Sequence, residues 1–212
     1  ILQIIAIDII LGGDNAIVIA LACKNLPEKQ RKLGIFYGAL GAIILRVIMV
    51  FFATSLLMIS GLKIIGGLLL LWIGVKLILD NGKDTSIKVS QEKNLFAAIR
   101  TIIVADFVMS LDNSVAIAAA ADGNMYLVIF GVLLSIPIII WGSSIILKLI
   151  DKYPVIIYLG SGLLGWIAGD MIKTDIFTLS FFGFAEANKY LSLAGSFIVI
   201  IYSYLHMKIF TR

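Results

Sequence analysis

The sequence is poor in the residues that build thiolate and imidazole sites. Its 212 residues include one cysteine, Cys23, one histidine, His206, and three prolines. A single cysteine cannot form a disulfide bond within the chain, and one cysteine with one histidine cannot complete a Cys/His metal cluster in one chain. We therefore expect any bound metal to be held mainly by oxygen atoms.

Charge is also scarce in this chain. Only 14% of the residues are charged and 61% are hydrophobic, with a mean hydropathy of +1.08. Soluble domains contain about 25% charged and about 45–50% apolar residues, so the composition excludes an ordinary soluble domain. The net charge of +4 reflects the excess of Lys and Arg that is common in cytoplasmic loops of membrane proteins. We expect the lipid bilayer, and no nucleic acid, as a partner.

The apolar runs predict an all-α integral membrane protein with about seven transmembrane helices. The expected spans are residues 1–22, 34–59, 62–79, 95–121, 125–149, 155–173 and 190–208. Polar linkers are expected at 24–33 and 80–94. The chain begins with Ile1 inside an apolar run, so we expect a few residues to precede it; the run has no basic segment and contains two aspartates, which argues against a signal peptide.

The distribution of basic residues predicts the orientation. Eleven Lys and Arg residues fall in loops on one side of the predicted spans and three on the other. Because basic loops stay in the cytoplasm, we expect the N-terminus outside and the C-terminus in the cytoplasm. Arg46 is exceptional, because it lies near the middle of the second span and cannot easily extend its charge to the interface.

The pattern D-x5-D-N occurs twice, from Asp8 to Asn15 in the first span and from Asp106 to Asn113 in the fourth. A second match pairs residues 66–74 with 160–168. We therefore expect one transport domain, residues 1–212, built from two repeats. The first repeat is 1–79 and the second is 95–173; a cytoplasmic linker at 80–94 joins them, and an extra helix at 190–208 follows. Three spans per half make the halves inverted in the membrane, an architecture of secondary transporters with a site near the midplane.

Acids inside spans are costly, which favours a function for them. A carboxylate at the bilayer centre costs at least ~2.5–3.5 kcal/mol. One such acid could serve only to hydrogen-bond neighbouring spans, but two copies of one constellation favour a binding site. The predicted metal ligands are Asp8, Asp14, Asn15, Asp106, Ser110, Asp112 and Asn113. Helical spacing turns Asp14 and Asp112 away from the other ligands, so we expect the first span to be broken at Gly12–Gly13.

Carboxylate, amide and hydroxyl oxygens suit a hard divalent cation such as Mn2+, Mg2+ or Ca2+. Four carboxylates exceed the charge of one such ion, so some must be protonated or paired, and proton/metal antiport is our hypothesis. Arg46 is the expected counter-ion in the absence of metal; the alternative is a pair that only holds spans together. Asp170 is a weaker candidate for the ion path; the alternative is an acid solvated at the outer interface with Lys173 and Asp175.

The runs Asp8-Ile-Ile-Leu-Gly-Gly-Asp14-Asn15-Ala16 and Asp106-Phe-Val-Met-Ser-Leu-Asp112-Asn113 resemble the two acidic helix motifs of the TerC family, within the LysE-like transporter group. The run from Leu2 to Gln30 resembles the YjbE-type members from Bacillus. The resemblance implies a seven-span protein of the bacterial cytoplasmic membrane that exports Mn2+. Gly12-Gly13 stands where the second copy has Ser110-Leu111, so a serine ligand is expected only in the second copy.

Two other functions compete with transport. A membrane scaffold or metal sensor would bind a cation without moving it. An intramembrane aspartyl protease would need two aspartates on separate spans, such as Asp106 with Asp14 or Asp170, but would leave the second Asp-Asn pair and the repeat unexplained. We therefore expect a transporter rather than an enzyme.

Overall fold

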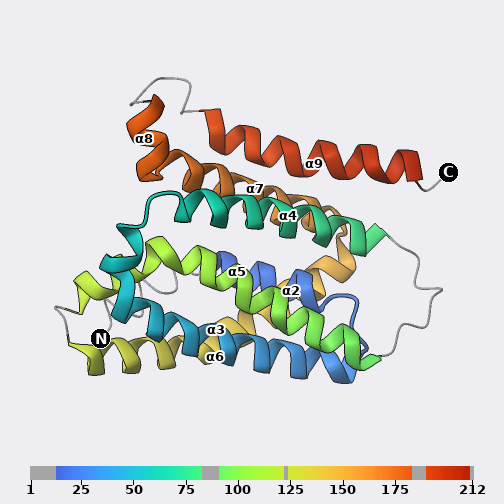
Figure 1. The fold of residues 1–212 in the computed structure, drawn as a ribbon. Helices are drawn as coiled ribbons and strands as arrows, with labels where there is room; N and C mark the ends of the chain where they lie inside the picture. Colours follow the sequence, from blue (N-terminus) through green and yellow to red (C-terminus); the bar gives the residue numbers. More distant parts are fainter. Residues whose placement is uncertain (1–12, 83–90, 122–123, 183–189, 211–212) are drawn as a thin grey trace. The chain divides into compact units, whose positions relative to one another are not determined.

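The computed structural model describes residues 13–82, 91–121, 124–182 and 190–210, and these ranges contain helices and no strand (Figure 1). The all-α prediction is thus confirmed for the described part of the chain. The helices are α2 (Gly13–Cys23), α3 (Glu28–Leu57), α4 (Leu62–Gly82), α5 (Gln91–Ala120), α6 (Met125–Lys152), α7 (Val155–Lys173), α8 (Ile176–Phe182) and α9 (Leu191–Phe210).

Four described helices, α3, α4, α6 and α7, are long and apolar enough to cross a membrane. A fifth candidate is α5, which bends by 62° between its segments Leu95–Leu111 and Asn113–Ala120. The apolar helices α2 and α9 are shorter. The structure therefore supports four to five spans among the described residues, and the seven-span plan and its orientation stay predictions.

The helix bounds correct one expectation from the sequence. The linker expected at 24–33 is too long, because α3 already begins at Glu28; the carbonyl of Pro27 accepts hydrogen bonds from Gln30 N and Arg31 N at 2.8 and 2.9 Å. The polar start of α3 therefore continues the helix beyond its apolar part. The short helix α8 lies between the predicted spans 155–173 and 190–208, in a stretch for which the sequence analysis made no prediction.

The chain divides into two compact units. The first comprises Ile1–Leu56 and Ile87–Tyr153, and the second comprises Leu57–Ser86 and Pro154–Arg212. Among the described helices, α2, α3, α5 and α6 fall in the first unit, while α4 and α7 to α9 fall in the second. Each unit thus takes corresponding spans from both of the predicted halves.

In the first unit, α2 packs against α5 and α6. Ile43 and Val50 of α3 belong to one buried cluster with residues from the end of α5 and the start of α6, including Val128 and Val132. At the opposite ends of these two helices, Arg31 Nη1 donates to Asp151 Oδ2 at 2.9 Å. The start of α3 therefore lies beside the end of α6, so the two helices run antiparallel.

In the second unit, α7 packs against both α4 and α9 (Figure 1). Small residues let these helices approach closely. A methyl group on Gly165 would overlap the backbone of Gly195 on α9. On the other side, a Cβ on Gly67 of α4 would lie 2.6 Å from the carbonyl oxygen of Ala168.

The α4–α7 contact has an internal symmetry. Besides the approach of Gly67 to Ala168, a Cβ on Gly74 would lie 3.2 Å from the carbonyl oxygen of Ser161. In the sequence match of 66–74 with 160–168, Gly67 corresponds to Ser161 and Gly74 corresponds to Ala168. Exchanging the two matched segments therefore converts one contact into the other, as in an interface with a two-fold axis.

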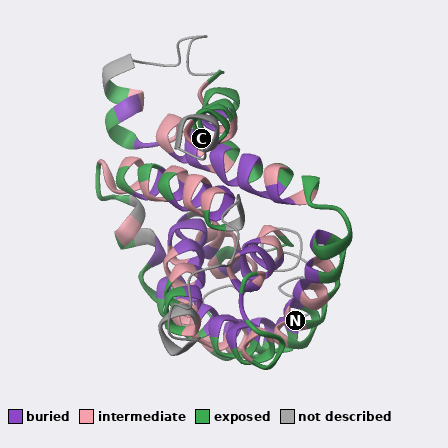
Figure 2. Ribbon diagram, turned by 90° about the vertical axis from the view of Figure 1, so that its right-hand side faces the viewer, coloured by how far each residue is buried: buried purple, intermediate pink, exposed green. Residues whose placement is uncertain are grey.

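Apolar side chains cover the outside of the helices as well as their packed faces. Figure 2 shows helices that carry buried residues on one side and exposed residues on the other. Phe51, Tyr126 and Trp141 are each at least 70% exposed. So many exposed large apolar side chains are expected of helices that face lipid.

Asp175 corrects another expectation, because it is buried rather than solvated. It is 1% exposed. Its carboxylate accepts hydrogen bonds from Gly61 N at 3.0 Å, Lys63 N at 3.1 Å and Phe177 N at 2.8 Å. It therefore caps the N-termini of α4 and α8 together, and its charge is favourable at these positive ends of the helix dipoles.

Candidate ion-binding site

A buried charged pair lies between α3 and α5 in the first unit. Arg46 Nη2 donates to Asp106 Oδ1, and Arg46 Nε donates to Ser110 Oγ at 3.2 Å. Ser110 Oγ in turn donates to Asp106 Oδ2 at 3.2 Å. The three side chains thus form one connected polar group, and the sequence analysis had singled out all three.

The local helix geometry explains this grouping. Asp106 and Ser110 are four residues apart on α5, so their side chains lie on the same face one turn apart. Arg46 reaches them from α3, and the side chains of Arg46 and Asp106 are 2% and 3% exposed. Removing two charges from water costs several kcal/mol per ion unless each is paired and hydrogen-bonded. The guanidinium group is therefore the cation that compensates the buried carboxylate in this structure.

The start of α2 contributes unpartnered polar atoms to the same unit. Asn15 is 4% exposed, and its Oδ1 and Nδ2 have no hydrogen-bond partner; Oδ1 of Asp14 is also buried and unpartnered. Helix α2, which carries Asp14 and Asn15, packs against α5, which carries Asp106. An unsatisfied buried polar group costs about 1–3 kcal/mol. These oxygens are therefore available to a ligand near the paired carboxylate.

Helix α5 bends at the second copy of the acidic motif. The bend of 62° in α5 falls between Leu111 and Asn113, and the hydroxyl of buried Ser114 donates to the carbonyl oxygen of Ser110 across it. Serine bonding to the carbonyl four residues earlier often accompanies a bend. In the first copy, Gly13 is the first described residue and Gly12 lies outside the described part, so the predicted break there stays a prediction.

Three predicted ligands remain without a described role. Asp8 lies outside the described residues, and so does the side chain of Asp112, although its backbone is part of α5. Asn113 is half-buried, one position after the bend. No group of three or more His, Cys, Asp or Glu side chains suited to a metal occurs within the part of the chain that the structure describes. The predicted metal coordination is thus neither built nor contradicted by the described side chains.

Asp170 lies in the second unit, on α7. Its carboxylate pairs with Lys173, accepts a hydrogen bond from Ser192 Oγ at 3.2 Å and is 48% exposed. Lys173 is also the residue that the alternative interpretation of Asp170, as an acid at the outer interface, places beside it. A role for Asp170 in the ion path stays a prediction.

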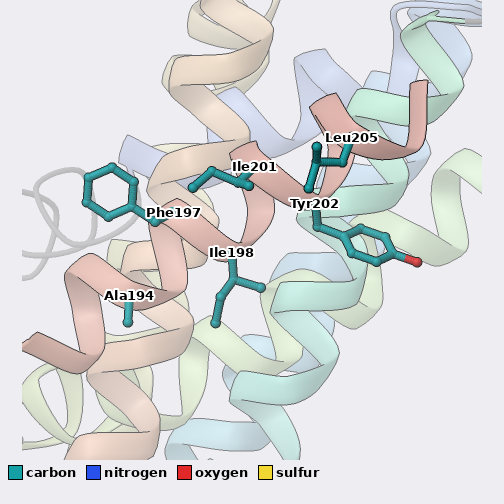
Figure 3. A pocket seen from close by; sticks show the side chains of 6 residues that line it. All are labelled: Ala194, Phe197, Ile198, Ile201, Tyr202 and Leu205. Atoms are coloured by element: carbon teal, nitrogen blue, oxygen red, sulfur yellow. The ribbon is translucent and has the colours of Figure 1, made fainter. Parts of the chain in front are cut away.

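A hollow of about 470 Å³ along α9 offers no comparable chemistry (Figure 3). Its lining consists of Ala194, Phe197, Ile198, Ile201, Tyr202 and Leu205. Only the hydroxyl group of Tyr202 is polar among these side chains, whereas a hard cation needs several oxygen ligands. This surface is suited to hydrocarbon and not to a metal ion.

Our interpretation of the sequence missed two polar residues that support the fold. Ser114 lies at the α5 bend, and Asp175 caps two helices. An aspartate directly before the apolar run Ile176–Phe177 is a recognised helix start signal and could have indicated the second of these roles. The position of Ser114, one turn after Ser110, gave no such signal.

Apolar helices long enough to cross a membrane, with charged residues paired in their interior, define a multi-pass integral membrane protein. The chain belongs to the integral membrane protein TerC family, whose sequence profile matches residues 1–212. This finding confirms the family that the acidic motifs suggested.

Among its relatives is the uncharacterized membrane protein YjbE of Bacillus subtilis (strain 168), which is 45% identical over 174 residues, or 82% of this chain and 79% of the relative. The uncharacterized membrane protein YkoY of the same strain is 26% identical over 222 residues, covering 96% of this chain and 68% of the relative. The UPF0053 protein YegH of Escherichia coli (strain K12) is 24% identical over 229 residues, covering 100% of this chain and 42% of that protein. No solved structure matches the chain.

Proposed function

We propose that the protein is a membrane transporter that exports divalent metal cations, with Mn2+ as its substrate, from the bacterial cytoplasm. The observation that carries the proposal is the buried Arg46–Asp106 pair, together with the unpartnered oxygens of Asp14 and Asn15 on α2, which packs against α5. The family membership and the resemblance of both motifs to those of the TerC family support the same substrate.

The donor atoms favour a hard cation. Asp14, Asn15, Asp106 and Ser110 offer carboxylate, amide and hydroxyl oxygens, and Asp8, Asp112 and Asn113 would add ligands of the same kind. Mn2+, Mg2+ and Ca2+ all accept such ligands, whereas Zn2+ and Cu+ favour imidazole or thiolate. The oxygen ligands support the class of ion, and the choice of Mn2+ among these ions comes from the resemblance.

Arg46 supplies a reason for exchange rather than permanent binding. In the structure its guanidinium group already neutralises Asp106. A divalent cation that takes Asp106 as a ligand must displace Arg46, because two cations cannot share one buried carboxylate without repulsion. We propose that Arg46 returns to Asp106 when the metal leaves, and that protons balance the remaining acids as the coupling ion.

An inverted repeat would give this site access to both sides of the membrane. The reciprocal contacts of Gly67 with Ala168 and of Gly74 with Ser161 support such a repeat, because they relate matching positions of the two halves across antiparallel helices. Transporters with inverted repeats bind their substrate near the midplane, between the repeats. Transport therefore accounts for two features that the intramembrane protease leaves unexplained, namely the repeat and the second Asp-Asn pair.

The test is metal uptake into proteoliposomes containing the purified protein, measured for Mn2+, Mg2+, Ca2+ and Zn2+ with and without an imposed pH gradient. Wild-type protein should transport Mn2+, and Asp106→Asn and Asp14→Asn should each lower the rate about tenfold or more. Asp8→Asn and Asp112→Asn should do the same. Asp151→Asn is the matched control, because this exposed carboxylate pairs with Arg31 at the end of α6 and should transport normally.

Each failure has a distinct meaning. Wild-type rates in the Asp106 and Asp14 variants would refute the site. Mn2+ binding without flux in wild-type protein would refute transport and favour the membrane scaffold or metal sensor. Transport that does not respond to a pH gradient would refute proton coupling while leaving the site intact.

A further inference from the structure

Six basic residues gather at one end of the α3–α6 pair in the first unit. They are Lys24, Lys29, Arg31, Lys32, Lys148 and Lys152. The ion pair of Arg31 with Asp151 fixes the start of α3 beside the end of α6, so basic stretches about 120 residues apart in the sequence meet at one end of the unit. Glu28 and Asp151 are the acids within these two stretches, so the end keeps a net positive charge.

The opposite end of the same two helices has no basic residue. From Val47 to Leu57 on α3, and from Met125 to Leu147 on α6, the chain contains no Lys or Arg. The helices are antiparallel, so these two stretches extend away from the basic end. Apart from Arg46, which is buried against Asp106, the cations of the pair are therefore confined to one end.

Helix length places the cations at a definite depth in a bilayer. With 30 residues in α3 and 28 in α6, and a rise of about 1.5 Å per residue, the helices are roughly 45 and 42 Å long. A bilayer is about 30 Å thick across its hydrocarbon and about 40–45 Å with the headgroups. When the apolar stretches fill the hydrocarbon, the basic ends lie at the level of the lipid phosphates.

Each helix also presents cations and apolar side chains on one exposed face. Both stripes follow the spacing i, i+3, i+4, i+7, which lies along a single face of a helix. The exposed stripes are Lys29, Lys32, Leu33 and Phe36 on α3, and Ile145, Lys148, Leu149 and Lys152 on α6. On both helices the outermost position is a lysine and the innermost position is apolar, which matches a lipid with a charged headgroup above its acyl chains.

We propose that this basic end of the α3–α6 pair is a binding surface for anionic phospholipids. The lysines contact the phosphate of a lipid such as phosphatidylglycerol, and the apolar residues of the same stripes contact its acyl chains. A zwitterionic lipid carries its own cation beside the phosphate and gains less from the lysines. The proposal concerns the bilayer and not the transported ion, so it stands or falls independently of metal export.

The test uses full-length protein in mixed micelles containing equal amounts of phosphatidylglycerol and phosphatidylcholine, with retained lipids counted by native mass spectrometry. The wild-type protein should retain more phosphatidylglycerol than phosphatidylcholine, and the ratio of the two retained lipids measures the preference. Each cation removed should lower that preference on the order of fivefold at low salt. Two double variants, Lys29→Gln with Lys32→Gln and Lys148→Gln with Lys152→Gln, should therefore each reduce the preference of the altered stripe roughly 25-fold.

The control removes the same charge elsewhere. Lys63→Gln with Lys173→Gln alters two lysines of the second unit and should leave the preference at the wild-type value. Raising the salt concentration should weaken the wild-type preference, because exposed charges are screened. Equal retention of both lipids by wild-type protein, or an equal loss in the Lys63 and Lys173 variant, would overturn the proposal.

Discussion

Replacing Arg46 by leucine should destabilise the protein strongly, because the change leaves Asp106 buried without its cation. The side chains of the pair are 2% and 3% exposed, so water compensates neither of them. Two unit charges about 4 Å apart attract by about 4 kcal/mol at an effective dielectric constant of 20. Breaking one partner of a buried pair typically costs about 3–5 kcal/mol. We therefore expect a loss of this size in the free energy of unfolding.

The measurement is a double-mutant cycle in detergent micelles, with unfolding followed by circular dichroism. Arg46→Leu and Asp106→Leu should each be costly, whereas the double variant should cost at least about 2 kcal/mol less than their sum, because it leaves no unpaired charge. Arg31→Gln is the matched control. Its pair with Asp151 is exposed, so its loss should cost about 1 kcal/mol or less.

Additive effects in the cycle would refute the reasoning, and so would an Arg46 variant as stable as the Arg31 control. Either result would mean that the two buried charges do not depend on each other for compensation. The cycle tests the pair alone and does not require that the protein transport a metal.

Other positions give equally direct tests. Asp175→Ala should lower the free energy of unfolding by about 2–4 kcal/mol, because it removes the cap of two helices; a change below about 0.5 kcal/mol in denaturation would contradict this role. Gly195→Ala should destabilise the protein by about 1–3 kcal/mol or more, since its methyl group meets the backbone of α7, whereas Gly142→Ala, whose nearest neighbour is 3.9 Å away, should unfold like wild type. Asn15→Leu should keep or raise stability, because both amide atoms are unpartnered, and yet weaken Mn2+ binding measured by calorimetry; unchanged binding would remove Asn15 from the site.

The acidic motifs could be found in the sequence because their signal is local. Asp106 and Ser110 share a helix face through their spacing alone, and the structure shows the hydrogen bond between them. The bend of α5 was harder to place. We expected a break at the glycine pair of the first copy, whereas the described bend lies at Asp112 in the second, where no glycine or proline marks it.

The sequence by itself determined the class of protein, its family and the kinds of metal ligand that it can offer. Hydropathy established an all-helical membrane chain, because the bilayer selects long apolar segments irrespective of how they later pack. The repeated motif identified the family, and the shortage of Cys and His excluded a thiolate or imidazole site. All of these properties depend on composition and on residues close together in the sequence, so they can be predicted without knowing which helices pack together.

Only the tertiary structure decided which charges compensate each other. Arg46 and Asp106 are 60 residues apart, and nothing in their local sequence specifies that the guanidinium group meets this carboxylate rather than another. Asp175 and Gly61 are 114 residues apart, and their contact turns an acid expected in solvent into a buried helix cap. Such pairings depend on which helices pack side by side, and that is set by the fit of their surfaces over the whole unit.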